Sequence, residues 1–385
     1  MNTGLTPIMV FIAILSFCGH SVHAGPSIEW EHHFVEEGSP LNAVMTASPH
    51  NSNLLVCVKS NGSPQSHSLP SVLLWWVSQK GERIRSLEVT KNDPNTDLKL
   101  TLFSTPCAVA LEDGGALVLT HSQKGGMWLV RLDQAGKTIS VKQLPFPSYV
   151  YIERIASTID GNFLLIGSLN QDAFATKIDI QGNTIWENTY DYGRDEHFTS
   201  VLPAQDGGCV FVGNSVAPVR TVGGQSEVWA VKCDDLGKKQ REKAFPGRNA
   251  RAAKTQDGNY IIIYDTASDN DPGVWVRVLG ADLNELWSKQ VLAAEPRTSD
   301  FNIATVSNGD YVIAGMRKMT YFMAVLDQKG NQVWNFTDNR ESRSFMCLDL
   351  IGVGESALAC TSFLAIREGH KPSFGIGLLK LDCAH

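Results

Sequence analysis

Arginine side chains recur in the polar segments that separate the apolar runs of this chain, and some have acidic or histidine neighbours, as in RDEH at Arg194–His197. A guanidinium group is a planar fork of donors that matches carboxylates and phosphates, and Arg is enriched at protein interfaces. The pattern predicts a surface that binds a protein partner, an anionic small molecule or a glycan. The candidate binding residues are Arg154, Arg194, His197, Arg248, Arg251, Arg297, Arg340 and Arg343.

Two other interpretations of these charged segments stay open. Charges on exposed loops can simply be solvated or paired with one another. Two loop carboxylates can also cleave a glycosidic bond. The sequence contains no serine-nucleophile motif, no zinc-protease motif and no phosphate-binding loop motif. We therefore assign no catalytic residue, and non-catalytic binding is the preferred interpretation. The loop carboxylates considered for catalysis are Asp195, Glu196, Glu295 and Glu341.

Two acidic segments offer oxygen ligands of the kind that calcium prefers. They are Asp93–Asp97 and the group of Asp265, Asp269 and Asp271. Neither contains the Glu that, at the end of a calcium-binding loop, binds the ion through both of its carboxylate oxygens. Asn, Asp and Pro are also ordinary turn residues, which explains these segments without a metal. We predict no metal site and no cofactor, with calcium as the one ion left open.

Seven cysteines follow Cys18, and their spacing matches no metal-binding pattern. Most lie inside apolar runs, where Cys acts as a small hydrophobic residue. We expect them to fill the core. Disulfides between Cys209 and Cys233, and between Cys347 and Cys360, stay open because each pair falls on neighbouring predicted strands.

The first 24 residues have the features of a secretory signal peptide. Ile8–Cys18 is apolar but shorter than the roughly 20 residues that span a bilayer, and Val22-His23-Ala24 has the small-residue spacing of a cleavage site. We expect a periplasmic or secreted monomer without a transmembrane segment, with residues 25–385 as one domain. The net charge of −7 argues against a nucleic-acid partner.

The elements that must position these side chains belong to an internal repeat. IDIQGNTIW at Ile178–Trp186 returns as LDQKGNQVW at Leu326–Trp334, with weaker copies at Arg131–Ile139 and Lys232–Gln240. Each unit has an apolar strand, a tight turn, a second apolar strand, a variable loop, a strand that opens on an aromatic residue, and a fourth strand. The tight turns are at Asp113-Gly114, Asp160-Gly161, Asp206-Gly207, Asp257-Gly258 and Asn308-Gly309.

These turns recur every 46 to 51 residues, which matches the four-stranded blade of a β-propeller. With one degenerate unit at each end, the chain contains seven blades. Its end, KLDCAH, stops where a fourth strand is due, and Ser27–Phe34 supplies an isolated strand with Trp30 near the expected position. We predict an all-β, seven-bladed propeller of antiparallel strands, closed when the N-terminal strand joins the last blade.

The meander puts the two kinds of connection on opposite faces of the ring. The short turns between first and second strands, and between third and fourth strands, lie on one face, which we call the regular face. The longer loops and the links between blades lie on the other, the irregular face, which carries most of the candidate arginines. Arg154 and Arg251 occupy the same position in the first strands of their blades, and we expect them near the axial channel. Variable loops on a rigid scaffold are where binding residues tend to occur.

The repeats resemble those of exported bacterial propellers of the quinoprotein-like superfamily. The resemblance rests on Asp179, Gly182 and Trp186, and on Asp327, Gly330 and Trp334, whose spacing is similar to that repeat signature. It implies the fold, and a function either as an inert assembly scaffold or as a quinone-dependent dehydrogenase. The adjacent cysteine pair of many such dehydrogenases does not occur here, and their usual number of blades is eight. A quinone-dependent or glycan-active enzyme is therefore the alternative to a binding propeller.

Overall fold

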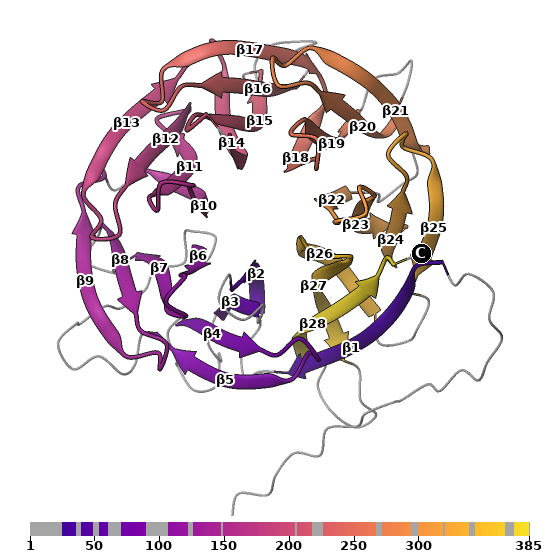
Figure 1. Cartoon of the computed structure of the whole chain (residues 1–385), viewed down its shortest axis with the longest axis horizontal. Coiled ribbons are helices and arrows are strands. Elements are labelled where there is room, and N and C mark those ends of the chain that lie inside the picture. The colour runs from indigo at the N-terminus through magenta and orange to yellow at the C-terminus, as the bar shows by residue number, and fades with distance from the viewer. Residues whose placement is uncertain are drawn as a thin grey trace, which may run out of the picture.

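A computed structural model describes residues 25–35, 40–48, 54–60, 71–89, 107–121, 126–147, 149–204, 206–217, 226–266, 272–293, 299–318, 320–338, 343–365 and 373–384. In these ranges the chain forms seven antiparallel sheets of four strands each, arranged in a ring (Figure 1). The predicted seven-bladed propeller is confirmed. None of the described residues forms a helix long and apolar enough to cross a membrane.

The blades follow one another around the ring in chain order. Blade 1 consists of β2 (Pro40–Ala47), β3 (Leu54–Ser60), β4 (Ser71–Val77) and β5 (Arg83–Glu88), and blade 2 of β6 (Cys107–Ala110), β7 (Ala116–His121), β8 (Met127–Leu132) and β9 (Thr138–Leu144). Blade 3 consists of β10 (Tyr151–Ser157), β11 (Phe163–Leu169), β12 (Asp172–Ile178) and β13 (Thr184–Tyr190). Blade 4 consists of β14 (Asp195–Pro203), β15 (Cys209–Val216), β16 (Glu227–Cys233) and β17 (Lys239–Pro246). Blade 5 consists of β18 (Arg248–Lys254), β19 (Tyr260–Thr266), β20 (Gly273–Leu279) and β21 (Glu285–Ala293), and blade 6 of β22 (Ser299–Thr305), β23 (Tyr311–Arg317), β24 (Thr320–Leu326) and β25 (Gln332–Thr337). Blade 7 consists of β26 (Arg343–Val353), β27 (Ser356–Ala365), β28 (Ser373–Asp382) and β1 (Ser27–Val35).

The last blade is completed by the N-terminal strand, as the sequence predicts. Strand β1 pairs with β28 in antiparallel register from Ser27 opposite Asp382 to Val35 opposite Gly375. In Figure 1 the indigo β1 lies along the yellow β28. This pairing removes the open edge that a linear array of blades would leave.

The repeated Asp and Gly form the turn between the third and fourth strands. In blade 3, Asp179 Oδ1 accepts hydrogen bonds from the backbone N–H groups of Gln181 at 2.9 Å and Asn183 at 2.8 Å. Gly182 lies between them with φ of 77°, a left-handed conformation that favours glycine. Burial raises the pKa of Asp179, but the hydrogen bonds from Asn183 and Gln181 outweigh it and leave the pKa lowered.

In blades 3 and 7, a Trp on the outermost strand connects the blade to the next one. Trp186 Nε1 of blade 3 donates to the carbonyl of Asp235 in the turn of blade 4 at 3.0 Å. Trp30 of blade 7 repeats this contact with the carbonyl of Gln79 in blade 1 at 2.9 Å. A Cβ added at Gly237 would lie 2.7 Å from the Trp186 ring, so the ring occupies the space that a side chain would need. The signature therefore forms an interblade contact.

Bulges in the innermost strands set the direction of the channel side chains. In β10, Ile152 pairs with Gly167 and Arg154 with Ile166, so that Glu153 is an extra residue. In β14 the same shift occurs between Phe198 and Ser200, opposite Gly213. Such bulges bend a strand and re-aim its side chains, here close to the axis of the ring.

Gly213→Ala is expected to lower the free energy of unfolding by about 3 kcal/mol, because overpacking a tight site costs that much. The added Cβ would lie 1.9 Å from the carbonyl oxygen of His197. Gly258→Ala is the matched control: its φ is +83° but no atom lies within 4 Å of the added Cβ. We expect the control to cost only the roughly 1 kcal/mol of a left-handed alanine. Urea unfolding followed by tryptophan fluorescence measures both, and equal losses would contradict the close-packing role.

The hydrophobic core lies between neighbouring blades, and the cysteines belong to it. All seven cysteines after Cys18 are buried and free, as expected for core residues. Cys209 and Cys233 are direct partners on β15 and β16 but form no disulfide. Cys347 lies opposite Thr361 and Cys360 opposite Asp349, so that second pair is not aligned.

Candidate functional site

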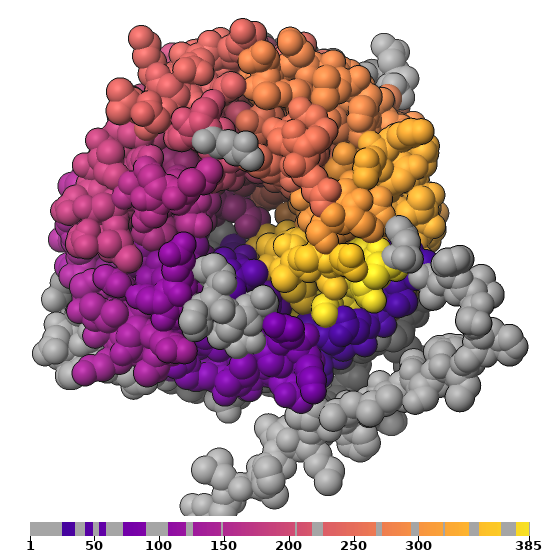
Figure 2. Space-filling view, viewed as in Figure 1, coloured from indigo at the N-terminus to yellow at the C-terminus, as the bar shows by residue number. Residues whose placement is uncertain are grey.

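Four charged side chains from three blades meet on the axis of the ring, where the space-filling view is hollowed (Figure 2). Glu153 and Arg154 come from β10, Arg251 from β18 and Asp349 from β26, all innermost strands. Arg154 pairs with Asp349 and Arg251 pairs with Glu153. These four residues, the channel cluster, join blades that are not neighbours.

Asp349 is the most buried member of the channel cluster, with a side chain only 2% exposed. Its Oδ1 accepts from Arg154 Nη2 at 2.9 Å, and its Oδ2 accepts from the backbone N–H of Met45 at 2.8 Å. Burial lowers the pKa of Arg154, but the Asp349 carboxylate outweighs burial and leaves that pKa raised. Asp349 therefore ties blade 7 both to blade 1 and, across the channel, to blade 3.

Arg251 is held in a similar way but less tightly. Its Nη2 lies 3.2 Å from Glu153 Oε1, and its Nη1 donates to the carbonyl of Ala250 at 3.3 Å. Burial lowers the pKa of Arg251, and Glu153 opposes that effect. The thiol of Cys107, on β6 of blade 2, donates to the backbone carbonyl of Glu153 at 3.3 Å. This hydrogen bond connects the bulge of β10 to the neighbouring blade.

His197 lies beside this cluster, and its pKa is lowered from the usual value of histidine. Burial lowers its pKa, and although Glu153 raises it, Arg251 lowers it again. Asn214 Nδ2 lies 3.3 Å from His197 Nε2, while Asn214 Oδ1 accepts from the backbone N–H of Ala250 at 3.2 Å. The amide N–H thus faces the ring nitrogen, which suits an uncharged imidazole that accepts.

The channel cluster is electrically balanced, with two guanidinium groups and two carboxylates. A cavity of about 180 Å³ lies next to it, lined by residues of β2, β6 and β10 that include Thr46, Glu153 and Ser157. Pockets for small-molecule ligands usually measure about 300 to 1,000 Å³. This cavity therefore suits a few waters better than a substrate.

Arg194 and Arg248 lie on the irregular face, and both have acidic partners. Arg194 pairs with Glu227 at 3.0 Å, and Arg248 Nε pairs with Asp265 at 2.7 Å. Arg343 opens β26, but its side chain is outside the described part of the chain, as are Arg297 and Arg340. The structure thus brings Arg154, Arg251 and His197 together, and leaves Arg194 and Arg248 in separate surface pairs.

The acidic segments considered for calcium or catalysis fall mostly outside the described residues. This applies to Asp93–Asp97, Asp269, Asp271, Glu295 and Glu341. Asp265 is engaged by Arg248 and by the Asn249 amide at 2.7 Å. Glu196 is described and is buried, with 1% of its surface exposed.

Sequence reasoning missed the acidic half of the channel cluster. Glu153 precedes Arg154 directly, and an Arg next to an acidic residue on one bulged strand was an available signal. Asp349 had none, since it is separated from Arg154 by 195 residues. Only the closed ring places the two side chains opposite each other.

Comparisons with known proteins show the fold and no more. No model of a protein family matches the chain, and no curated protein sequence matches it. Among solved structures, puromycin hydrolase matches 85% of this chain with 12% identity and a TM-score of 0.57, over 50% of its own length. The WD40 propeller domain of Doa1 matches 92% of this chain and 97% of its own, with 9% identity and a TM-score of 0.53. The Dos1 propeller matches 90% of this chain and 93% of its own, with 11% identity and a TM-score of 0.50.

Proposed function

We propose that this chain is an exported, non-catalytic binding propeller whose irregular face contacts a protein partner. The observation that carries the proposal is a set of large side chains left exposed at the irregular-face end of the inner strands. Tyr149 is 60% exposed and Tyr151 is 37% exposed, both at the start of β10. Tyr and Met are enriched at protein interfaces, and Tyr is frequent among the residues that carry binding energy. Further members are Tyr192 at 38% and Met346 at 39%.

The charges on the same face support a protein partner rather than a small anion. The described guanidinium groups of Arg154, Arg194, Arg248 and Arg251 each lie within 3.2 Å of a carboxylate. A small anion would have to compete with these carboxylates. A protein surface can instead use the exposed tyrosines for contact area and leave the ion pairs as a polar rim.

The channel supports binding rather than catalysis for a related reason. A general acid or base must lie within hydrogen-bond reach of the proton that it transfers, directly or through one water. In the channel cluster each carboxylate is paired with a guanidinium group, and the half-buried His197 lies beside Asn214. The adjacent cavity of about 180 Å³ is too small to hold a sugar ring together with the sugars linked to it.

The Tyr149→Ala/Tyr151→Ala variant is expected to retain at least 10-fold less partner than the wild-type chain, because interface tyrosines often contribute about 2 kcal/mol each. The immobilised chain is incubated with the exported-protein fraction of its source organism, and retained proteins are quantified by mass spectrometry. Neither substitution removes a buried side chain, so the double variant should remain folded.

The matched control is Ile159→Ser/Leu236→Ser, on the regular face. These side chains are 74% and 67% exposed, so the control removes as much exposed apolar surface from the opposite side of the ring. A partner retained equally by the wild-type chain and the control, but lost from the tyrosine variant, supports the proposal. Equal retention by all three chains, or loss from the control alone, contradicts it.

A further inference from the structure

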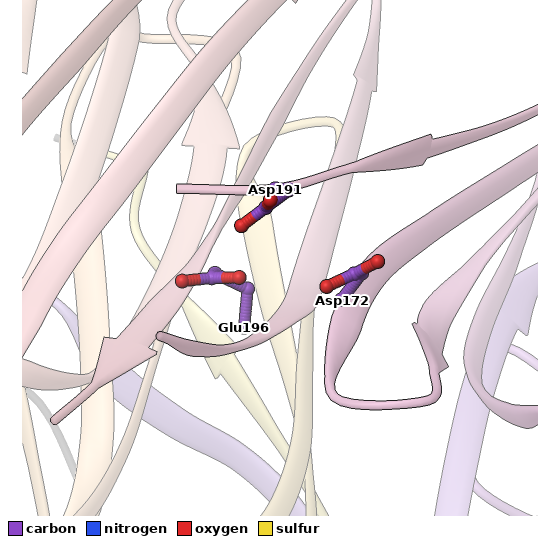
Figure 3. Close-up of side chains that lie close together, drawn as sticks. All are labelled: Asp172, Asp191 and Glu196. Carbon is purple, nitrogen blue, oxygen red and sulfur yellow. The ribbon is translucent and has the colours of Figure 1, made fainter. Parts of the chain in front are cut away.

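Three carboxylates converge on the irregular face at the junction of blades 3 and 4. Asp172 opens β12 after the tight turn at Asn170 and Gln171, Asp191 directly follows β13, and Glu196 is the second residue of β14. One oxygen from each carboxylate lies within 4.8 Å of the other two. Figure 3 shows the three groups facing a common space from three different segments.

Glu196 supplies an observation that is independent of this grouping. The residue is 1% exposed, and its Oε2 is buried with no hydrogen-bond partner in the described part of the chain. Its Oε1, in contrast, accepts from the backbone N–H of Arg194 at 2.8 Å and from Ser215 Oγ at 3.1 Å. Half of a buried carboxylate is therefore held in place while the other half lacks a partner, and native structures rarely leave such an atom unsatisfied.

The electrostatic surroundings of the three carboxylates add to this imbalance. Burial raises the pKa of Glu196, the neighbouring amides and Ser215 lower it, and the charge of Asp191 raises it again. In the described ranges no Lys or Arg forms an ion pair with Asp172, Asp191 or Glu196. Three negative groups so close together attract a cation.

We propose that Asp172, Asp191 and Glu196 form a binding site for a divalent cation, and that the cation is Ca²⁺. The ion links blade 3 to blade 4 and satisfies the buried oxygen of Glu196. It lies next to the segment that carries the exposed Tyr192, whose ring contacts Trp229 with 5.4 Å between centroids. This site is distinct from the two acidic segments that the sequence suggested for calcium, and it is independent of the proposed partner.

The geometry favours Ca²⁺ over other common cations. All the ligands are hard carboxylate oxygens, with no sulfur or imidazole that would favour zinc. Calcium–oxygen distances are about 2.3 to 2.6 Å, so two oxygens on one ion lie up to about 5 Å apart, which accommodates the observed limit of 4.8 Å. Magnesium binds at about 2.0 to 2.1 Å with near-ideal octahedral geometry and is usually held by only one or two carboxylates.

The test measures Ca²⁺ binding to the metal-depleted full chain by equilibrium dialysis with radioactive Ca²⁺. We expect one ion per chain with a dissociation constant of about 10⁻⁴ to 10⁻³ M, the range of weak calcium modules. Asp191→Asn and Asp172→Asn are each expected to weaken binding at least 10-fold. Asp235→Asn is the control, because this exposed carboxylate on the regular face has no hydrogen bond or ion pair in the described residues. The control variant should bind Ca²⁺ as tightly as the wild-type chain does.

Thermal unfolding distinguishes a cation site from a merely structural cluster. Without metal, Asp191→Asn removes a like-charge repulsion and should melt at or above the wild-type temperature. With about 10 mM CaCl₂, ten times the weakest expected dissociation constant, the wild-type chain should gain stability and melt above the variant. The order of the two melting temperatures therefore reverses on adding Ca²⁺.

Several results would overturn the proposal. One is the lack of bound Ca²⁺ in the wild-type chain at about 10 mM, ten times the upper limit of the expected range. Another is binding that survives unchanged in both Asp172→Asn and Asp191→Asn, which would place the ion elsewhere. Equal stabilisation by MgCl₂, or by NaCl at the same ionic strength, would overturn the assignment to Ca²⁺.

Discussion

Asp349→Ala is expected to lower the free energy of unfolding by about 3 to 5 kcal/mol, the usual cost of removing one partner from a buried ion pair. The substitution leaves the Arg154 guanidinium without its partner at 2.9 Å and the backbone N–H of Met45 without its acceptor at 2.8 Å. Urea unfolding at pH 7, followed by tryptophan fluorescence, measures the loss.

The large effect follows from the position of Asp349 in the ring. Most contacts in a propeller join neighbouring blades, whereas this carboxylate joins blade 7 to blade 3 across the channel and to blade 1 at its side. Its side chain is only 2% exposed, so both of its hydrogen bonds are made away from bulk water, where losing them costs most. Arg154 is 25% exposed and recovers part of its hydration, which keeps the cost within that range.

Two controls separate the channel cluster from ordinary surface charge. Asp282→Ala removes an exposed carboxylate whose distances to Lys232 and Arg241 are both 3.9 Å, and it should cost less than about 1 kcal/mol. The double variant Arg154→Met/Asp349→Leu should lose at least about 1.5 kcal/mol less than the sum of its single variants, because each single change strands a charge. The proposed role is wrong if Asp349→Ala costs no more than Asp282→Ala.

A chain that begins at residue 36 should melt at least about 10 °C below one that begins at residue 25. The shorter chain lacks β1, so that β28 becomes an unpaired edge and blade 7 keeps only three strands. It also loses Trp30, which bonds to the turn of blade 1. A loss of about 5 kcal/mol at roughly 2 °C per kcal/mol gives this estimate for a large domain.

A peptide of residues 25–36 added in trans supplies a sharp control. It should restore part of the melting temperature of the shorter chain, and the same peptide with Trp30→Ala should restore less. Partial recovery that depends on Trp30 shows that pairing and the interblade contact both act. Equal melting of the two chains, with no response to the peptide, would show that closure by β1 contributes little to stability.

The fold was readable from the sequence because its signals are local and repeated. Asp179, Gly182 and Trp186 show how: the Asp accepts from amides two and four residues ahead, the Gly takes a left-handed conformation, and the Trp contacts the next blade about 50 residues on. Each requirement recurs in other blades, so the sequence states it several times. The closing role of Ser27–Phe34 was predicted for the same reason, since one strand was left over at the N-terminal end and one was missing at the C-terminal end.

The site was readable only in part. Arg154 and Arg251 occupy equivalent strands and were expected near the channel, and the structure places both in the channel cluster. Their acidic partners were missed, and the charge of this region changes from basic to neutral once Glu153 and Asp349 are included. Binding by the irregular-face arginines stays a prediction, with Arg297, Arg340 and the Arg343 side chain outside the described residues.

The number of blades, the turns and the interblade tryptophans can be read from the sequence, because they depend on contacts within one repeat or between adjacent repeats. The closed ring is needed to show which charges neutralise each other and which carboxylates converge. Asp349 meets Arg154 across 195 residues, and Asp172, Asp191 and Glu196 meet at a junction of two sheets. Such pairings occur once, depend on the curvature of the closed ring, and leave no periodic trace in the sequence.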